Sequence, residues 1–277
     1  MFNLNRLWKI FAFVSFSYTL TFEVASAQNY DCFAKMPEAG KYNHTYNLSY
    51  NSTLVSNHNA YSSRYLELDG KNGYTLSKDG QAFVYYRGQK LFDDLSEKYV
   101  ALDTQLGYRH RLCLDEDWLW SASVVYSLPV NHDVQKYDHS RGYVSIPTSF
   151  IWNDESNLNI TLRATTRRYF YQYTDNEGGK TLKQWAFEPG IMLAYTLDDL
   201  TFNADFYDYI GWDFNGAQLY SEYLHEESID WAATKKWTIS LMHRSDGRVA
   251  NYAGTGYDIA LHDKDRSEIA IGLSFTE

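Results

Sequence analysis

The chain has 277 residues with 35 acidic and 25 basic side chains, a formal net charge of −10 and a mean hydropathy of −0.49. This low hydropathy, with no apolar run of spanning length after residue 30, excludes a helical membrane protein, and an aromatic content of 17% excludes a disordered chain. The acidic excess argues against a nucleic-acid partner, because a phosphate backbone would be repelled, and leaves small solutes, divalent ions and lipid as expected partners.

The first 27 residues are typical of a cleaved secretory signal peptide. Arg6 and Lys9 supply the positive charge, residues 10–22 the apolar stretch, and Ala25-Ser26-Ala27 the small-residue cleavage site. A retained helical anchor is the alternative. We therefore expect a mature chain from Gln28, with residues 28–41 as a periplasmic N-terminal segment and residues 42–277 as one domain.

The two cysteines, Cys32 and Cys113, are predicted to form a disulfide, because export delivers the chain to an oxidising compartment. Such a bond would draw the N-terminal segment across the periplasmic mouth of the domain as a tether or partial plug. Two unpaired thiols are the alternative.

A period of two runs through segment after segment of about ten residues or more. In residues 42–54 the even positions are mostly aromatic or aliphatic and the odd positions are all polar. The same contrast returns at 100–114, 118–128, 144–152, 158–170, 183–197, 200–212, 237–245 and 269–275. Soluble sandwiches also alternate, but their strands are mostly five or six residues long, whereas these segments are long enough to cross a bilayer at a tilt.

The connections alternate between short and long. The short links lie at 115–117, 153–157, 198–199 and 232–236, and the long polar ones at 130–141, 174–181, 213–218 and 246–256. Four tryptophans flank the short links, as an interfacial aromatic girdle requires: Trp118, Trp152, Trp231 and Trp237. Short turns on one side and long loops on the other are typical of bacterial outer-membrane barrels.

On these segments and turns the chain resembles the outer-membrane β-barrel proteins of Gram-negative bacteria from residue 42 to 275. The last segment, 269–275, is similar to their C-terminal assembly signal, although Thr276 and Glu277 follow the aromatic residue that usually ends it. The resemblance implies an all-β, closed antiparallel transmembrane β-barrel in the bacterial outer membrane. It also implies contact with outer-membrane lipid, lipopolysaccharide and the barrel-assembly machinery.

The short turns predict nine strands from Tyr99 to the C-terminus, if residues 257–275 form one strand. Segments 42–54, 60–68 and 74–86 add three, which gives about 12, the even number expected of such barrels. Ten or fourteen strands are the alternatives, because 69–73 and 77–80 both have turn composition.

The polar positions of the alternation are expected to line the lumen. They carry both signs of charge and several tyrosines, among them Arg109, Arg111, Arg163, Arg167, Asp103, Asp205, Glu188 and Tyr207. Twelve strands lie between eight-stranded barrels filled by side chains and sixteen-stranded porins. A narrow channel for small hydrophilic solutes and a closed structural barrel therefore both remain open.

One motif suggests a catalytic alternative. The sequence His243-Arg244-Ser245-Asp246-Gly247 is similar to the H-x-S-x-G segment of outer-membrane phospholipase A and to the H-x-S-N motif of lipid A 3-O-deacylases. The resemblance implies His243 as general base and Ser245 as nucleophile of an outer-leaflet acyl hydrolase. Both residues share the lipid-facing side with Trp237. The alternative is that His243 has no catalytic role and is an interfacial aromatic residue.

The third catalytic residue is not fixed by the motif. In those families it follows the serine by about a dozen positions, where this chain has Tyr257 and then Asp258. Glu227 or His225 on the preceding strand is the alternative, since folding about 232–236 pairs 243 with roughly 225. Calcium would be expected only with the hydrolase; otherwise we expect no cofactor, and acidic pairs such as Asp93-Asp94 are interpreted as solvated turns, so no metal site is predicted.

Overall fold

The computed structural model describes residues 39–54, 63–93, 96–102, 104–114, 117–153, 157–176, 178–219, 221–249, 262 and 266–277. Its strands are β1 (Tyr42–Thr53), β2 (Arg64–Ser77), β3 (Gly80–Asp93), β4 (Ser96–Ala101), β5 (Thr104–Cys113), β6 (Trp118–Leu128), β7 (Ser140–Asn153), β8 (Leu158–Tyr171), β9 (Lys183–Leu197), β10 (Leu200–Asp213), β11 (Glu222–Trp231), β12 (Trp237–Arg248) and β13 (Glu268–Thr276). One short helix, α2 (His132–Asp138), precedes β7. Among these residues, no helix has the length and hydropathy that crosses a membrane.

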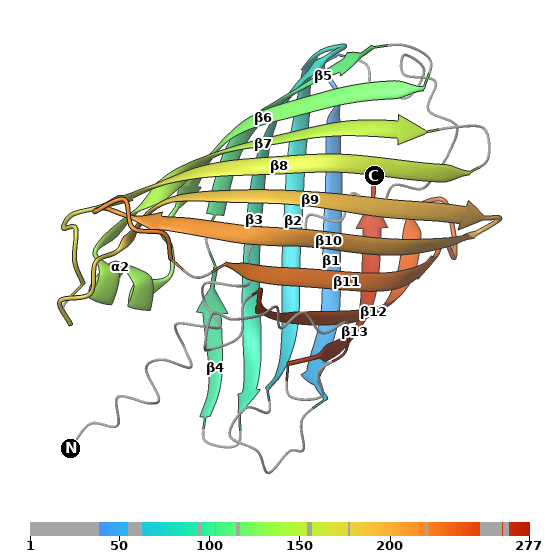
Figure 1. The fold of residues 1–277 in the computed structure, drawn as a ribbon. Helices are drawn as coiled ribbons and strands as arrows, with labels where there is room; N and C mark the ends of the chain where they lie inside the picture. Colours follow the sequence, from blue (N-terminus) through green and yellow to red (C-terminus); the bar gives the residue numbers. More distant parts are fainter. Residues whose placement is uncertain are drawn as a thin grey trace.

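The strands form one closed antiparallel barrel (Figure 1). Strands that follow one another in the chain pair with each other except at β4 and β5, and the pairing of β1 with β13 closes the barrel. Both β4 and β5 pair with β3 and follow one another along it, so they act as one interrupted strand. The predicted fold class is confirmed, with twelve strands rather than ten or fourteen.

One predicted turn is wrong. Residues 69–73 lie inside β2, and the hairpin to β3 forms at the alternative position, where Ser77 pairs with Gly80. Gly70 and Gly73 mislead because they have turn composition, yet each faces an aromatic partner on β3, Tyr86 and Phe83. A Cβ on Gly70 would lie 2.5 Å from the Tyr86 ring, so glycine here makes room for an aromatic ring beside the strand.

The last predicted strand, 257–275, is described only in part. The described portion is β13, and its earlier residues lie outside the described part of the chain. In contrast, the predictions 118–128 and 183–197 are confirmed residue for residue by β6 and β9. The β9–β10 turn at 198–199 places Asp198 at a positive φ of 52°, as a two-residue hairpin requires.

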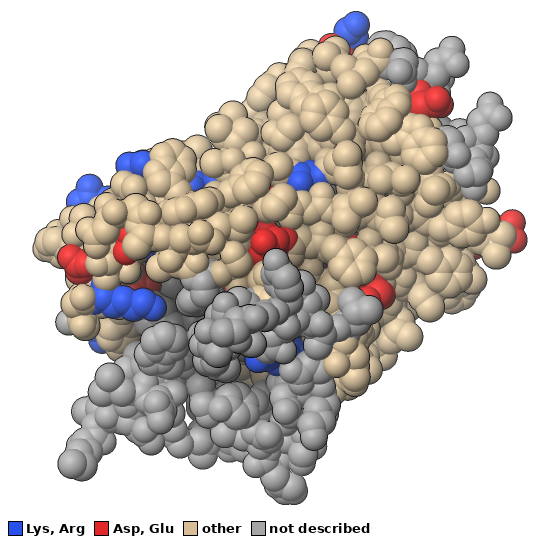
Figure 2. All heavy atoms as spheres, viewed as in Figure 1, with Lys and Arg blue, Asp and Glu red and all other residues tan. Residues whose placement is uncertain are grey.

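The two faces of the barrel wall differ in polarity. Leu241, Ile271 and Leu162 on the outer face are 52%, 60% and 48% exposed. The inward positions are buried and polar, as at Asn159, Ser127 and Asp205. Most of the described surface in Figure 2 is neither acidic nor basic. An apolar outer wall around a polar interior is the arrangement of a barrel set in lipid.

Candidate functional site: the lumen wall and an outward polar cluster

Ion pairs between arginines and carboxylates bridge the strands on the inner wall. Arg163 on β8 lies 2.6 Å from Asp205 on β10, and Arg167 lies 2.8 Å from Glu188 on β9. Farther round the wall, Arg244 on β12 pairs with Glu268, its direct partner on β13. Each pair therefore sets a carboxylate against a guanidinium along the wall, so that positive and negative charge cancel locally.

Gly190 makes the Arg163–Asp205 pair feasible, which reaches from β8 to β10 across the intervening strand β9. It lies on β9 directly between Arg163 and Tyr207 in the register, so the Arg163 side chain must cross it to reach Asp205 on β10. A Cβ on Gly190 would come within 2.8 Å of the Phe206 carbonyl oxygen and 3.0 Å of the Arg163 Nε. Only glycine leaves this path open without a shift of the surrounding wall.

Tyrosines surround the second pair. Tyr143 and Tyr169 pack together with ring centroids 5.3 Å apart, and the Arg167 guanidinium lies 5.5 Å from the Tyr143 ring centroid. Lys183 contacts the hydroxyl of Tyr209, whose ring centroid lies 4.3 Å from the Lys183 ammonium. The inner wall thus presents cations over aromatic faces as well as ion pairs.

The other residues predicted for the lumen are placed as follows. Arg109 and Arg111 occupy the inward positions of β5, where the Arg109 guanidinium lies 5.8 Å from the Phe83 ring centroid. Tyr207 lies under the Arg163 guanidinium at 4.9 Å. Asp103 lies outside the described residues.

At the long-loop rim, α2 carries a buried carboxyl group. Asp138 ends the helix and is 8% exposed. Burial raises the pKa of its carboxyl group to about 6, and the neighbouring basic side chains of His139, Lys180 and Lys183 limit the rise. This part of the rim is therefore expected to respond to mildly acidic pH.

A polar cluster interrupts the apolar outer wall on β11 and β12. Below it, Ile229 on β11 and Leu241 on β12 are exposed and face each other in the register. Two positions further toward the long-loop end, Glu227 faces His243, and two further still His225 faces Ser245. The predicted pairing of 243 with roughly 225 was therefore wrong by two residues, because the hairpin is centred one residue later than a turn at 232–236 implies and its last pair is Trp231 with Ile239.

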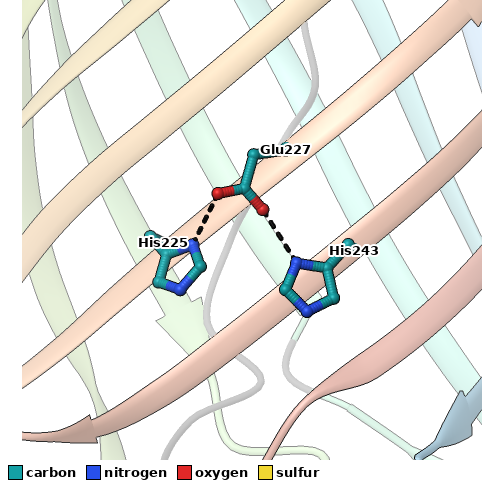
Figure 3. A group of neighbouring side chains, drawn as sticks. All are labelled: His225, Glu227 and His243. Atoms are coloured by element: carbon teal, nitrogen blue, oxygen red, sulfur yellow. Dashed lines mark hydrogen bonds and ion pairs between the residues drawn. The ribbon is translucent and has the colours of Figure 1, made fainter. Parts of the chain in front are cut away.

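Glu227 joins the two imidazoles (Figure 3). Its Oε1 lies 2.9 Å from Nδ1 of His225 and its Oε2 lies 2.8 Å from Nδ1 of His243. An ionised carboxylate only accepts hydrogen bonds, so each ring donates from Nδ1; in the neutral tautomer that does this, the lone pair is on Nε2. Both Nε2 atoms and the Ser245 Oγ are buried without a hydrogen-bond partner.

The cluster is held in place by its neighbours. His225 is 1% exposed and has two aromatic neighbours: its ring centroid lies 5.8 Å from that of Phe206 on β10 and 6.5 Å from that of Tyr223 on its own strand. The exposed His262 places a further imidazole 5.6 Å from that of His243. Of the predicted catalytic residues, His243, Ser245 and Glu227 thus come together, whereas Asp258 lies outside the described residues.

Sequence reasoning missed the role of His225, which was named only as an alternative to Glu227. The signal was present, because the outward alternation of β11 changes from Trp231 and Ile229 to Glu227 and His225. Polar residues on the lipid-facing side are costly away from the interfaces. A break in the apolar pattern on two neighbouring strands therefore indicates a site.

No protein-family model and no curated protein matches the chain. Solved structures do: the NanC porin in a rhombohedral crystal form is 14% identical, with 84% of this chain and 98% of that chain covered and a TM-score of 0.57. An outer membrane channel from Pseudomonas putida F1 is 12% identical, with 87% and 97% covered and a TM-score of 0.57. A KdgM porin in complex with disordered oligogalacturonate is 7% identical, with 83% and 98% covered and a TM-score of 0.51. These likenesses show the fold, and none supports the resemblance to phospholipase A.

Proposed function

We propose that the protein is a narrow channel for small hydrophilic solutes in the bacterial outer membrane. The observation that carries this proposal is the closed twelve-stranded barrel with an apolar outer wall and a charged inner wall. The solved structures of the same fold are described as porins and an outer membrane channel, which is consistent with the proposal.

The inner wall suggests weak selectivity. Its carboxylates at 188, 205 and 268 are paired with arginines along the wall, so the permeating solute meets a surface of both signs rather than one net charge. Twelve strands enclose a lumen between the filled eight-stranded barrels and the open sixteen-stranded porins. Small neutral or zwitterionic hydrophilic solutes fit this description best.

Liposome swelling tests the proposal. Vesicles containing the purified barrel should swell in a small sugar or amino acid at a rate that falls steeply as solute size increases. Protein-free vesicles treated with the same detergent are the control. Folded barrel that gives no swelling above this control with any small solute would overturn the proposal and favour a closed structural barrel.

The remaining expectations about export and partners form part of the same proposal. Cleavage after Ala27, insertion by the barrel-assembly machinery and contact with lipopolysaccharide all follow from an outer-membrane location. The segment 1–27 lies outside the described residues. Mass spectrometry of the protein from outer membranes should find Gln28 as the first residue.

The disulfide between Cys32 and Cys113 also stays a prediction, because Cys32 lies outside the described residues. Cys113 ends β5 at the short-turn side and occupies an inward position. A bond would hold the N-terminal segment at this mouth of the lumen. Thiol labelling of the unfolded, unreduced protein should therefore label neither cysteine, and labelling of both would exclude the disulfide. If the bond exists, reduction should raise the conductance.

A second candidate function is outer-leaflet acyl ester hydrolysis. It is favoured by one observation: Glu227 holds Nδ1 of His243, while Nε2 of that ring and Oγ of Ser245 are both without partners. Oγ would attack the ester carbonyl, and Nε2 would take its proton and return it to the leaving alcohol. Water would then release the fatty acid from the serine.

The hydrolase is tested by acyl release. Wild-type protein should release fatty acid from phospholipid or lipopolysaccharide, with or without calcium, and Ser245→Ala should abolish release while the barrel still assembles. Wild-type protein that releases none from either lipid would exclude this function and leave the channel untouched.

A further inference from the structure

We propose that His225, Glu227 and His243 bind a divalent transition metal ion, zinc in the first place. The inference goes beyond solute passage, because the three side chains lie on the outer wall and line no part of the lumen. In the part of the chain that the structure describes, this is the one group of three histidine, cysteine or acidic residues close enough to share an ion.

The donor atoms already have the required spacing. One donor atom from each residue lies within 4.8 Å of the other two, and the carboxylate oxygens lie 2.9 Å and 2.8 Å from the Nδ1 atoms. Zinc binds imidazole nitrogen and carboxylate oxygen at about 2.0–2.2 Å, so donors in a tetrahedral site are roughly 3.3 Å apart. Small movements of three side chains would therefore convert the hydrogen-bonded cluster into a metal site.

The ion would replace the two hydrogen bonds that Glu227 now accepts. A neutral imidazole can move its proton from Nδ1 to Nε2 by tautomerisation, which frees the Nδ1 lone pair without loss of a proton. In His225 this proton would face the side where Ser245 lies opposite in the register, with an Oγ that has no partner. The site would then have two nitrogens and one oxygen from the protein.

Burial supplies the second, independent indication. His225 is 1% exposed, its ring lies beside those of Phe206 and Tyr223, and its Nε2 has no partner. A buried polar atom without a partner is costly. In the tautomer that metal binding requires, this Nε2 carries the proton and would donate it toward Ser245 Oγ, which has no partner either. Access remains open from the side of Glu227, whose side chain is 42% exposed.

The donor set selects the kind of ion. Two imidazoles and one carboxylate suit zinc and its transition-metal neighbours, and a fourth position is left for water or for the nearby His262. Calcium is disfavoured at these residues, because it takes six to eight oxygen ligands. Tilted strands rise roughly 2.4 Å per residue along the membrane normal, which places His243 roughly 15 Å above Trp237, within the outer part of the apolar band.

The metal site and the hydrolase use the same residues in different ways. A bound ion takes the Nδ1 lone pair of His243 and leaves the proton on Nε2, the atom that the hydrolase needs as its base, so zinc should inhibit any hydrolysis. The two uses separate at Ser245, which the hydrolase requires as its nucleophile and which is not a ligand of the metal ion. They also separate at His225, which only the metal site requires.

Zinc titration against a chromophoric chelator tests the proposal on the untagged mature barrel in detergent, after metal has been stripped. We expect one zinc per barrel. His225→Ala, Glu227→Gln and His243→Ala should each weaken binding by more than the roughly 10–100-fold typical of outer-shell substitutions. Ser245→Ala, which removes only the hydroxyl opposite His225, should weaken binding less than these three substitutions. His110→Ala should bind as the wild type does, because His110 occupies an outward position on β5, remote from the cluster.

Cobalt substitution provides a second readout. Cobalt in the wild-type barrel should give the intense visible absorption of a four-coordinate site, and this absorption should be absent in His243→Ala. Heat-modifiable mobility on gels checks that every variant is folded. The proposal is overturned if folded wild type and His243→Ala bind zinc equally, or if His110→Ala loses as much affinity as the three cluster variants. None of these results depends on whether the barrel conducts.

Discussion

The inner wall and the outward cluster both place carboxylates in a low-dielectric setting, but they partner them differently. In the lumen, Glu188 and Asp205 each face an arginine, which is always charged and has no lone pair to offer. On the outer wall, Glu227 faces two histidines, which are weaker donors but keep a free nitrogen each. The arginines cancel the charge of the lumen carboxylates, whereas the histidines on the outer wall keep nitrogen atoms that can bind a metal ion.

This difference suggests separate tasks for the two faces. Arginine pairs fix the shape and neutrality of the lumen wall, which suits passage of solutes. Histidines around one carboxylate leave lone pairs available to an ion or a proton, which suits metal binding or ester hydrolysis. Each prediction below changes one region and leaves the other as its reference.

The largest effect is expected from breaking a lumen pair. Arg167→Met leaves Glu188 buried without its cation, which should cost about 3–5 kcal/mol in the free energy of unfolding. The double variant with Glu188→Met should recover most of this loss, because no uncompensated charge remains. Urea unfolding in lipid vesicles measures both, and a double variant as unstable as the single one would show that the pair is not the cause.

The next effect contrasts the two faces of a single strand. Leu241→Arg places a charge on the lipid face and should cost about 2–4 kcal/mol, so that assembly into vesicles fails or slows. Its neighbour Ser240 points inward, where its register partner is Asp230, and Ser240→Arg should therefore assemble. Folded yields on gels give the comparison; equal yields would mean that the two faces are misassigned.

A smaller effect is expected from the glycine beneath a lumen pair. Gly190→Ala puts a methyl group 2.8 Å from the Phe206 carbonyl oxygen and 3.0 Å from Arg163, an overpacking that typically costs about 1–3 kcal/mol. Gly179, whose Cβ would meet nothing within 4 Å, lies in a loop at positive φ and tests only backbone strain. Unfolding free energies of both alanine variants separate the two causes.

The smallest predicted effect is a pH dependence of the rim. Because burial raises the pKa of Asp138 to about 6, the folded rim binds this proton more tightly than the unfolded chain does. Its contribution to stability is therefore greatest at low pH and is lost as pH rises from about 4 to above 6. Asp138→Asn should remove this dependence.

Hydrogen exchange of α2 at pH 5 and pH 8 measures this response. In the wild type, protection of the helix amides should fall between the two values, after correction for the intrinsic exchange rate. In Asp138→Asn it should stay constant. A wild-type helix with equal protection at both values would contradict the role given to Asp138.

The alternation of side chains accounts for how much could be predicted from sequence. β6 and β9 were predicted to the residue, because their apolar and polar positions alternate up to tight polar turns. The β2–β3 hairpin was misplaced, because Gly70 has turn composition but serves to accommodate the ring of Tyr86. That role depends on the neighbouring strand, which local sequence does not reveal.

The outward cluster was predictable in part for the same reason. Parity on β12 placed His243 and Ser245 on one face, but only the register of the β11–β12 hairpin brings His225 opposite Ser245 and Glu227 opposite His243. An error of two residues in that register leaves every side chain on its correct face and changes every partner. The face on which a side chain lies can be predicted from the sequence, but its partner on the neighbouring strand is known only from the structure.

Single-channel recording in a planar bilayer tests the central claim most directly. The account predicts discrete conductance steps smaller than those of sixteen-stranded porins. It also predicts that Arg109→Glu, on the inner wall, shifts the reversal potential in a salt gradient toward cations, whereas Ile271→Ala, on the outer wall, leaves it unchanged. Folded wild-type barrel that inserts into the bilayer and carries no current would contradict it.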